Sequence, residues 1–447
     1  MKLTFAAIGV VLILLSIYAY RTLPDPSAGG KTRLVWVTDN NPVRAEQVAL
    51  FNRLNPDLEL VIDPANTDQQ KVIVQSIGGV GPDLFDTYGR ESAEAYVASG
   101  IAWDITDRML EAGIDVPKVI WPAAVPSCVV NGRVYGFPCN VNANAIWFNK
   151  DVFDRSGVPY PKPGWTWPEF IEIAKKLTIR DERGRAKQFG LYWDFNATRD
   201  LVYQHGGRYF DPTATRCTLD SPEAIAGVKL SHDLMYVHKV APTPTEEAAL
   251  STQGGWGSGG ITFLMSGRVA MAYGGRWWLN LMRKQKGLRL GVVEIPYAKE
   301  RVTVGGARCT FINKNSPRRE QALRFIKFLA SREYNELLND QADALAPLMS
   351  ACYTDRFLHN PAHPEEDYNA VWREVVKNSI PAEFCPFLRG GEMEPINTQL
   401  DLVRGGLKDP ELACRDAARN ATARIRRNAR LIPHLGRLYR ELTGQEP

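Results

Sequence analysis

The chain has 447 residues, of which 45% are apolar and 23% are charged. A chain of this length exceeds what one ordinary hydrophobic core supports, so we expect two lobes or domains. The formal net charge is +4, but residues 415–440 hold eight Arg and one Asp, a local charge of +7 that leaves −3 on the rest. The main body is therefore not a polyanion binder, which argues against nucleic acid as a partner.

The first residues have the pattern of a targeting segment. Lys2 precedes an uncharged, mostly apolar run from Leu3 to Tyr20, and a Pro/Gly/Ser stretch follows at 24–30. This order is typical of an export signal. An uncleaved membrane anchor is the alternative, because about 18 apolar residues are just enough to span a bilayer. No Cys lies near the end of the run, which excludes a lipid-modified N-terminus. Residues 1–32 thus form a signal or anchor with its linker.

The next segment predicts a β-α-β unit. Leu34–Thr38 is rich in β-forming residues, and Leu58–Ile62 is a second such run. Between them, Asn41 and Pro42 suit the start of a helix, whose expected apolar face is Val48, Phe51 and Leu54. Such a unit requires parallel strands and a right-handed crossover. Ligands of open parallel sheets bind beyond the carboxyl ends of the strands, and those ends are polar here.

Later segments contain stronger local signals. Asn131-Gly132 within 129–134 predicts a tight hairpin. Thr166 and Glu169 form a capping box ahead of a helix. Two further helices have one apolar side each, formed by Ala322, Phe325, Ile326 and Leu329 in the first and by Cys414, Ala418, Ala421 and Ile425 in the second. On the second helix we expect Arg415, Arg419, Arg426 and Arg430 to face solvent, with a lipid- or partner-binding face as the alternative.

Several motifs typical of catalytic and cofactor-binding proteins occur here, but the residues around them do not fit those functions. Gly255–Gly260 has the G-x-G-x-x-G spacing, but no β-rich run precedes it, so we expect a loop rather than a phosphate cradle. His359 and His363 are four residues apart, but the prolines at 361 and 364 prevent the helix that would align them on a metal. The seven Cys include no CxxC pair, and their pairing is open. We therefore expect no metal, no cofactor and no catalytic residue.

Four segments in order resemble the extracellular sugar-binding proteins of ATP-binding-cassette (ABC) importers, the bacterial solute-binding family that includes maltose-binding protein. They are VYGFP at 134–138 with NANAIWFNKDVF at 142–153, WTWPEF at 165–170, SGRVAMAYGGRW at 266–277, and FINKNSP at 311–317 with the helical run 322–338. The resemblance covers about residues 34–350 clearly.

This resemblance implies an α/β fold of the type II periplasmic-binding-protein class. Two lobes with parallel-rich sheets and helices on both faces would be joined by crossing hinge strands. The implied division is lobe 1 at 33–140 and 312–355, lobe 2 at 141–311 and 356–447, hinge strands near 139–146 and 308–312, and a third crossing within 353–370.

The resemblance also implies the ligand-binding residues, since a sugar needs polar side chains and aromatic platforms. The candidates are Asp39, Asn41, Tyr88 and Arg90 on lobe 1, Asn142 and Asn144 at the hinge, and Trp193, Asp194, Asn196, Trp277 and Trp278 on lobe 2, with Glu392 and Glu394 as secondary candidates. Neighbouring residues of an extended chain point to opposite faces, so only one of Trp277 and Trp278 can face the cleft. Family position favours Trp277.

We therefore expect the substrate-binding subunit of an ABC importer, a monomer that takes a sugar and works with membrane permeases. Maltose itself is doubtful, because an acidic hinge position of the family is Asn142 here and an aromatic one is Thr87. We expect a periplasmic or extracytoplasmic protein, free or tethered to the cytoplasmic membrane. The alternatives are an exported carbohydrate-active enzyme with Asp194 and a Glu as acid and base, a binding protein for a non-sugar solute, and a sensor.

Overall fold

The computed structural model describes residues 11–12, 14–16, 18, 30–64, 68–250, 259–388 and 393–447. Most of the expected export segment lies outside these residues, as do Glu392 and the Gly255–Gly260 loop up to residue 258. Within the described part of the chain, no helix is both long and apolar enough to cross a membrane.

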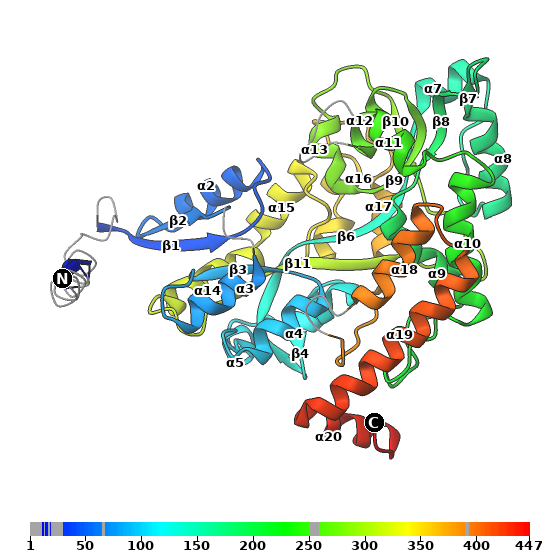
Figure 1. The fold of residues 1–447 in the computed structure, drawn as a ribbon. Helices are drawn as coiled ribbons and strands as arrows, with labels where there is room; N and C mark the ends of the chain where they lie inside the picture. Colours follow the sequence, from blue (N-terminus) through cyan, green and yellow to red (C-terminus); the bar gives the residue numbers. More distant parts are fainter. Residues whose placement is uncertain are drawn as a thin grey trace.

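One mixed sheet runs through both halves of the molecule (Figure 1). Its main path is β2 (Leu58–Ile62), β1 (Thr32–Val37), β3 (Leu84–Tyr88), β11 (Val304–Ile312), β6 (Gly136–Asn149), β9 (Val269–Gly275), β8 (Ala186–Tyr192) and β7 (Ile179–Arg180). Off this path, β10 (Leu290–Val293) pairs with β6, and β12 (Ile380–Pro381) pairs with β11. A separate hairpin consists of β4 (Val129–Val130) and β5 (Arg133–Val134).

The strand directions differ from the parallel-rich sheets that we expected. β1 pairs in parallel with β2 and β3, and β8 pairs in parallel with β9. β6 and β11, however, are antiparallel to each other and to their neighbours β9 and β3. β6 leads out of the first group of strands and β11 leads back into it, so these two adjacent strands run in opposite directions. Both pass between the halves where hinge strands were expected, while the lobe boundaries themselves stay a prediction.

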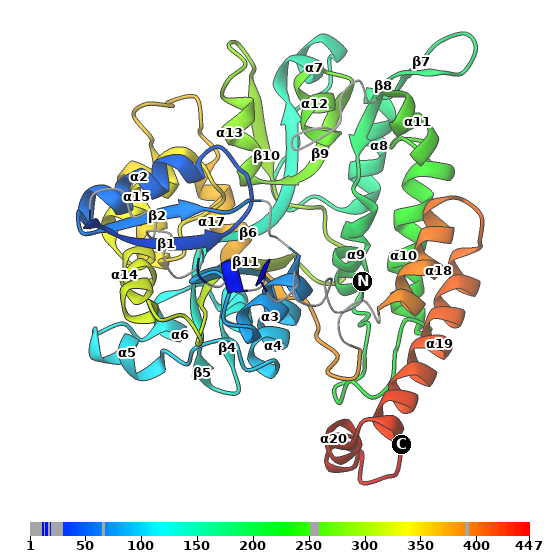
Figure 2. The same ribbon diagram turned by 60° about the vertical axis from the view of Figure 1, so that its left-hand side comes forward.

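Helices cover the sheet in both halves. Those around β1–β3 are α2 (Arg44–Leu54), α3 (Gln69–Ile77), α4 (Arg90–Ala98), α5 (Thr106–Glu111), α6 (Val116–Val119), α14 (Arg319–Leu329) and α15 (Arg332–Gln341). Those between β6 and β10 in sequence are α7 (Lys150–Ser156), α8 (Trp167–Leu177), α9 (Thr198–Gln204), α10 (Pro222–Tyr236), α11 (Pro244–Leu250), α12 (Gly260–Met265) and α13 (Leu279–Met282). The last are α16 (Asp355–Leu358), α17 (Asn369–Lys377), α18 (Glu394–Arg404), α19 (Pro410–Leu431) and α20 (Pro433–Thr443). α19 packs on α10 and α18, and α20 packs on α19 (Figure 2).

Several local features agree with the sequence patterns. Asn131 and Gly132 both have positive φ, as the tightest hairpin turn requires. Thr166 and Glu169 form the capping box at the start of α8. The expected apolar sides of α14 and α19 are buried, and the four expected arginines of α19 are exposed. These features depend on residues close together in the sequence, which explains why the sequence alone predicts them.

The buried side of α2 is an exception. We expected Val48, Phe51 and Leu54 to face the core, but only Phe51 is fully buried, and Leu54 is 49% exposed. The other buried residues of this helix are Arg44 and Gln47. Their polar groups find partners far along the chain, because Arg44 pairs with Asp343 and Gln47 donates to the same carboxylate at 3.3 Å. The first turns of α2 therefore face a polar region beside the cleft.

The seven Cys are all free and buried. The pairing that the sequence left open is thus absent from the structure, and each thiol lies among packed side chains. Burial raises the pKa of Cys139, Cys217, Cys352 and Cys414 to about 12, which keeps these groups as unreactive thiols.

Candidate functional site

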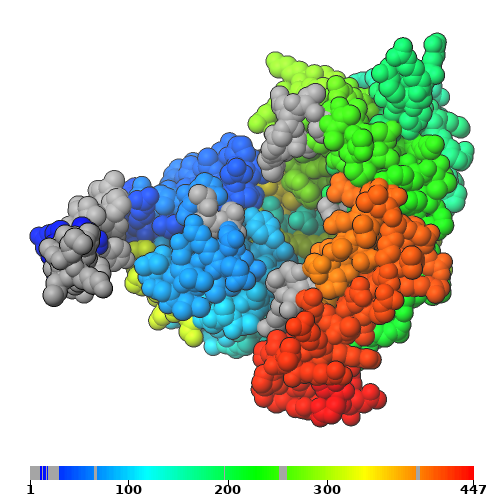
Figure 3. All heavy atoms as spheres, in the orientation of Figure 1, coloured from blue at the N-terminus to red at the C-terminus, as the bar shows by residue number. Residues whose placement is uncertain are grey.

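A cleft of about 640 Å³ lies where β6 and β11 cross between the two groups of strands. Figure 3 shows the hollow between the blue and cyan part of the surface and the green and orange part. The polar and glycine residues that shape it are Tyr88 at the end of β3, Gly89 after it, Asn142 and Asn144 in β6, Asp194 after β8, Thr198, Arg199 and Asp200 in α9, Tyr209, Tyr273 in β9, Gly305, Gly306 and Arg308 in β11, and Asn397 and Asp401 in α18. Tyr88, Arg199 and Gly306 also line an adjoining chamber of about 180 Å³.

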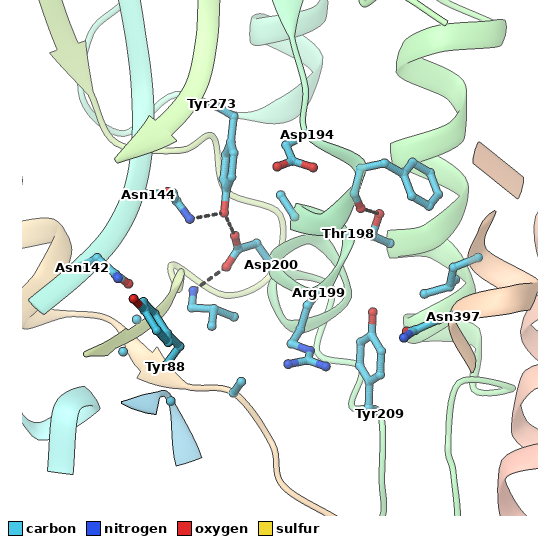
Figure 4. Close-up of a pocket in the computed structure, with 18 of the residues that line it drawn as sticks. Tyr88, Asn142, Asn144, Asp194, Thr198, Arg199, Asp200, Tyr209, Tyr273 and Asn397 are labelled. Carbon is cyan, nitrogen blue, oxygen red and sulfur yellow. Dashed lines mark hydrogen bonds between the residues drawn. The ribbon is translucent and has the colours of Figure 1, made fainter. Parts of the chain in front are cut away.

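One wall of the cleft is built around the buried carboxylate of Asp200 (Figure 4). The Tyr273 hydroxyl and the backbone N–H of Val304 both donate to this carboxylate. Asn144 Nδ2 donates in turn to the Tyr273 hydroxyl at 2.7 Å. Burial raises the pKa of Asp200 to about 6, although these hydrogen bonds favour its ionised form. The network joins α9, β9, β6 and β11 and so fixes Asn144 and Tyr273 at the cleft surface.

The opposite wall rests on a buried ion network. Arg308 Nη1 donates to Asp86 at 2.5 Å and to Thr38 Oγ1 at 2.7 Å. Arg44 donates through two nitrogens to Asp39, each at 3.1 Å. Burial would raise the pKa of Asp39, but the charges of Arg308 and Arg44 lower it to about 2. The network ties β11 to β1 and β3 and keeps Asp39 ionised although it is largely buried.

Arg199 is the cation at the junction of the cleft and the chamber. Its guanidinium lies over the ring of Tyr209, 4.7 Å from the ring centroid (Figure 4). No carboxylate of the described residues lies within 4.0 Å of it. Its N–H groups can therefore serve a bound acceptor, either a hydroxyl or an anionic group.

The structure brings four of the expected ligand-binding residues to the cleft. Tyr88, Asn142, Asn144 and Asp194 all line it. Tyr88 stands 59% exposed, and its hydroxyl lies 3.5 Å from Asp39. These residues come from the two groups of strands and from a crossing strand.

The remaining candidates of the first half lie further away. Arg90 lines the adjoining chamber, where it covers the ring of Phe384 at 4.7 Å. Asp39 supports Tyr88 from within the ion network, and Asn41 caps the turn before α2 by accepting from Val43 N at 3.3 Å. Neither Asp39 nor Asn41 is among the residues that line the cleft.

The tryptophans of the second half are packed against the protein. Trp193 is 4% exposed, and its ring packs on Tyr273 with centroids 4.7 Å apart. Trp277 and Trp278 lie in a 3₁₀ turn, Arg276–Trp278, so the alternation of an extended chain that we assumed for them is wrong. A Cβ built on Gly275 would lie 1.6 Å from the Trp277 ring, which therefore covers that glycine.

The Trp277 turn is held in place by its neighbour. Arg276 is 1% exposed and donates to the carbonyls of Ala344 at 2.8 Å and Asn339 at 3.4 Å. Trp278 is 9% exposed and packs on Gly274, whereas Trp277 is only half-buried. The strand partner of Gly275 is Asn144, a residue of the cleft wall, but Trp277 itself is not among the residues that line the cleft.

Three candidate ligand-binding residues remain, namely Asn196, Glu394 and Glu392. Asn196 lies in the 3₁₀ turn Phe195–Ala197, beside Asp194. Glu394 is exposed at the start of α18, where its carboxylate accepts from Thr398 at 3.1 Å. Glu392 lies outside the described residues.

Sequence reasoning missed Asp200, Tyr273, Arg199 and the Gly305-Gly306 pair. Tyr273 is inside the segment 266–277 that carried the resemblance, so its position was available. Nothing local marks Asp200, since its partners are 73 and 104 residues away in sequence. The glycines precede the expected hinge strand, and only the structure shows that a Cβ added at Gly306 would meet no atom within 4 Å.

A second cluster of ionisable groups lies away from the cleft. His363, Glu365 and Glu366 each bring one potential ligand atom to within 4.8 Å of the others. Glu366 already accepts two hydrogen bonds from Arg283, at 2.6 and 2.9 Å. The charge of Glu366 is thereby balanced. His359, which shares the four-residue spacing with His363, is not part of the group.

The raised pKa of Asp200 predicts a pH dependence of stability. Its proton stabilises the folded state fully below the ordinary value of 3.8, and this contribution is lost as the pH rises through about 6. We predict that the unfolding free energy of the wild-type protein, relative to Asp200→Asn, falls by about 3 kcal/mol between pH 3.5 and pH 7.5. Urea unfolding at a series of pH values measures this difference, in which the other carboxylates cancel. Parallel curves would contradict the assignment.

Comparison with known proteins finds similar proteins that cover most of the chain. An uncharacterized lipoprotein in the oleD 5′ region of Streptomyces antibioticus is 27% identical over 348 residues, covering 74% of this chain and 72% of that protein. An ABC substrate-binding protein from Listeria monocytogenes, solved in complex with cycloalternan, superposes with a TM-score of 0.74 at 23% identity, covering 88% of this chain and 98% of that one. UgpB from Mycobacterium tuberculosis in complex with glycerophosphocholine superposes with a TM-score of 0.72 at 17% identity, covering 89% and 99%.

These structures share the two-lobed type II fold. The model of one family, described as bacterial extracellular solute-binding protein, matches residues 37–336, more than half of the chain. The chain therefore belongs to the bacterial extracellular solute-binding protein family.

Proposed function

We propose that this protein is the substrate-binding subunit of an ABC importer, which captures a mono- or oligosaccharide in the cleft and delivers it to a membrane permease. The observation that carries the proposal is the chemistry of the cleft wall. Amide and hydroxyl groups from Asn142, Asn144, Tyr88 and Tyr273 predominate there. Such groups both donate and accept, which matches the hydroxyls of a sugar. The Listeria relative, with its bound cycloalternan, supports the same class of ligand.

In this proposal, both lobes and the hinge contribute ligand-binding residues. Tyr88 and Arg90 act from the first lobe, Asn142 and Asn144 from the hinge, and Asp194 and Asn196 from the second lobe. The ring of Trp277 covers the apolar face of a sugar ring. The protein acts as a monomer outside the cytoplasm, free or tethered by its apolar first segment, and releases its ligand unchanged.

A second candidate ligand is an anionic solute, and Arg199 favours it. This cation has no carboxylate within 4.0 Å among the described residues and lies where the cleft meets the chamber. A phosphodiester or an acidic sugar would match its charge. The UgpB relative in complex with glycerophosphocholine shows that the fold accommodates such a ligand.

A thermal-shift screen against sugars and glycerophosphodiesters tests the proposal. A ligand at about 100 times its Kd stabilises the folded protein by about 2.7 kcal/mol, which raises the melting temperature measurably. We expect a neutral saccharide to bind without turnover, and Arg199→Met to retain that binding. If only anionic solutes bind and Arg199→Met abolishes binding, the second candidate is correct. Steady release of product from a saccharide would contradict both.

Trp277 and Trp278 should differ in their contributions. Trp277→Ala removes the half-buried ring that we propose to cover the sugar, so we expect ligand affinity to fall by about 2 kcal/mol or more with little loss of stability. Trp278→Ala removes a buried ring, so we expect a loss of about 3–5 kcal/mol of stability. Calorimetric titration and melting of both variants measure these effects. If both bind and melt like the wild-type protein, neither ring is where we place it.

Gly306 offers a test that leaves the fold intact. Its Cβ would meet no atom within 4 Å, so Gly306→Ala adds a methyl group that points into the cleft without a clash. We expect unchanged or slightly higher stability and at least about tenfold weaker ligand binding, which is about 1.4 kcal/mol. Unchanged affinity for the saccharide found in the screen would show that it binds elsewhere.

A further inference from the structure

The C-terminal helices form a basic hairpin outside the family match. We define the basic hairpin as residues 421–440, the end of α19 and most of α20. It contains six Arg and no acidic residue, and it lies beyond the matched residues 37–336. Figure 1 shows it in red at the lower end of the molecule, away from β7 and β8. The cleft does not use it.

Most of its charge is not neutralised by the protein. No carboxylate of the described chain lies within 4.0 Å of Arg424, Arg426, Arg427 or Arg437. Just before the hairpin the pattern differs, because Arg415 and Arg419 are paired with acidic residues of their own helix at 2.5 Å each. The hairpin therefore concentrates positive charge on a body that is otherwise slightly negative, which favours an anionic partner.

Apolar side chains stand among these arginines. Leu431 at the corner of the hairpin is 66% exposed, and Leu442 just after it is 41% exposed. The inner side of α20 is nevertheless firmly packed, since Leu435 and Tyr439 are buried and the Tyr439 ring contacts Phe387 at 5.8 Å. The helix pair is thus folded, and it exposes both arginines and leucines to solvent.

We propose that the basic hairpin binds the anionic headgroups of a lipid bilayer, with Leu431 and Leu442 inserted between them. Arginines with exposed apolar neighbours are typical of helices that lie in the interface of a membrane. A bilayer supplies many equivalent anions to charges spread along two helices, whereas a single soluble anion would meet only one or two of them. This contact would hold an extracellular binding protein at the membrane surface independently of its cleft.

A fluorescent probe at the hairpin tests the proposal locally. All seven native Cys are buried, so an environment-sensitive dye on Leu442→Cys in the full chain reacts at the hairpin under native conditions. We expect a blue shift with phosphatidylglycerol vesicles and none with phosphatidylcholine vesicles. The shift should disappear in 1 M salt, where the Debye length is about 3 Å. Because the dye reports only its own surroundings, insertion of the apolar first segment cannot mimic this response.

Charge variants distinguish the effect of the hairpin on vesicle binding from the effect of the net charge of the protein. In the labelled protein, the triple change Arg426→Gln, Arg427→Gln and Arg437→Gln should weaken vesicle binding about 100-fold, at about 1 kcal/mol for each Arg. The matched control is Lys176→Gln, Arg183→Gln and Lys187→Gln, which removes the same charge from exposed residues of α8 and the β7–β8 hairpin. The control should bind like the wild-type protein. Equal loss in both triple variants, or no response to anionic vesicles, would overturn the proposal.

Discussion

The antiparallel pairing of β6 with β11 is the constraint on which the rest of the structure depends. The two strands pair from Gly136 and Phe311 at one end to Ala143 and Gly305 at the other, and both connect the two halves of the molecule. Each half adds its own strands to one of them, β3 to β11 and β9 to β6. The cleft therefore forms beside the two paired strands that join its walls.

Two buried carboxylates anchor β11 on either side of the cleft. Asp86 accepts from Arg308, and Asp200 accepts from the backbone of Val304. The stretch between these anchors contains Gly305 and Gly306, which line the cleft. Because Gly306 has no side chain and no close neighbour, the strand exposes backbone there and leaves room for a ligand. The polar cost of burying the anchors is offset by their charged and hydrogen-bonded partners.

The sequence could predict those features that depend on neighbouring residues. The bounds of β2, the Asn131-Gly132 turn and the capping box at Thr166 follow from local geometry and agree with the structure. The two-lobed fold followed from the order of family segments rather than from any single one. Four of the residues that the resemblance implied as ligand-binding line the cleft.

Features set by distant contacts could not be predicted in this way. Arg44 is buried in α2 because two carboxylates neutralise it, Asp39 nearby in the sequence and Asp343, which is 299 residues later. Trp277 and Trp278 come one residue after a buried strand, and no local signal shows that the chain turns into a 3₁₀ helix there. The role of Asp200 likewise depends on Tyr273 and Val304, which approach it only in the folded protein.

The central claim is that the cleft between the two halves is the ligand site and that they close on it around β6 and β11. Small-angle scattering with and without a saturating ligand from the thermal-shift screen tests this most directly. We predict a smaller radius of gyration in the bound protein. For Gly306→Ala, we predict an unchanged radius of gyration at a ligand concentration too low for this variant to bind. An identical profile of the wild-type protein at saturation would contradict closure and point to a rigid site on one lobe.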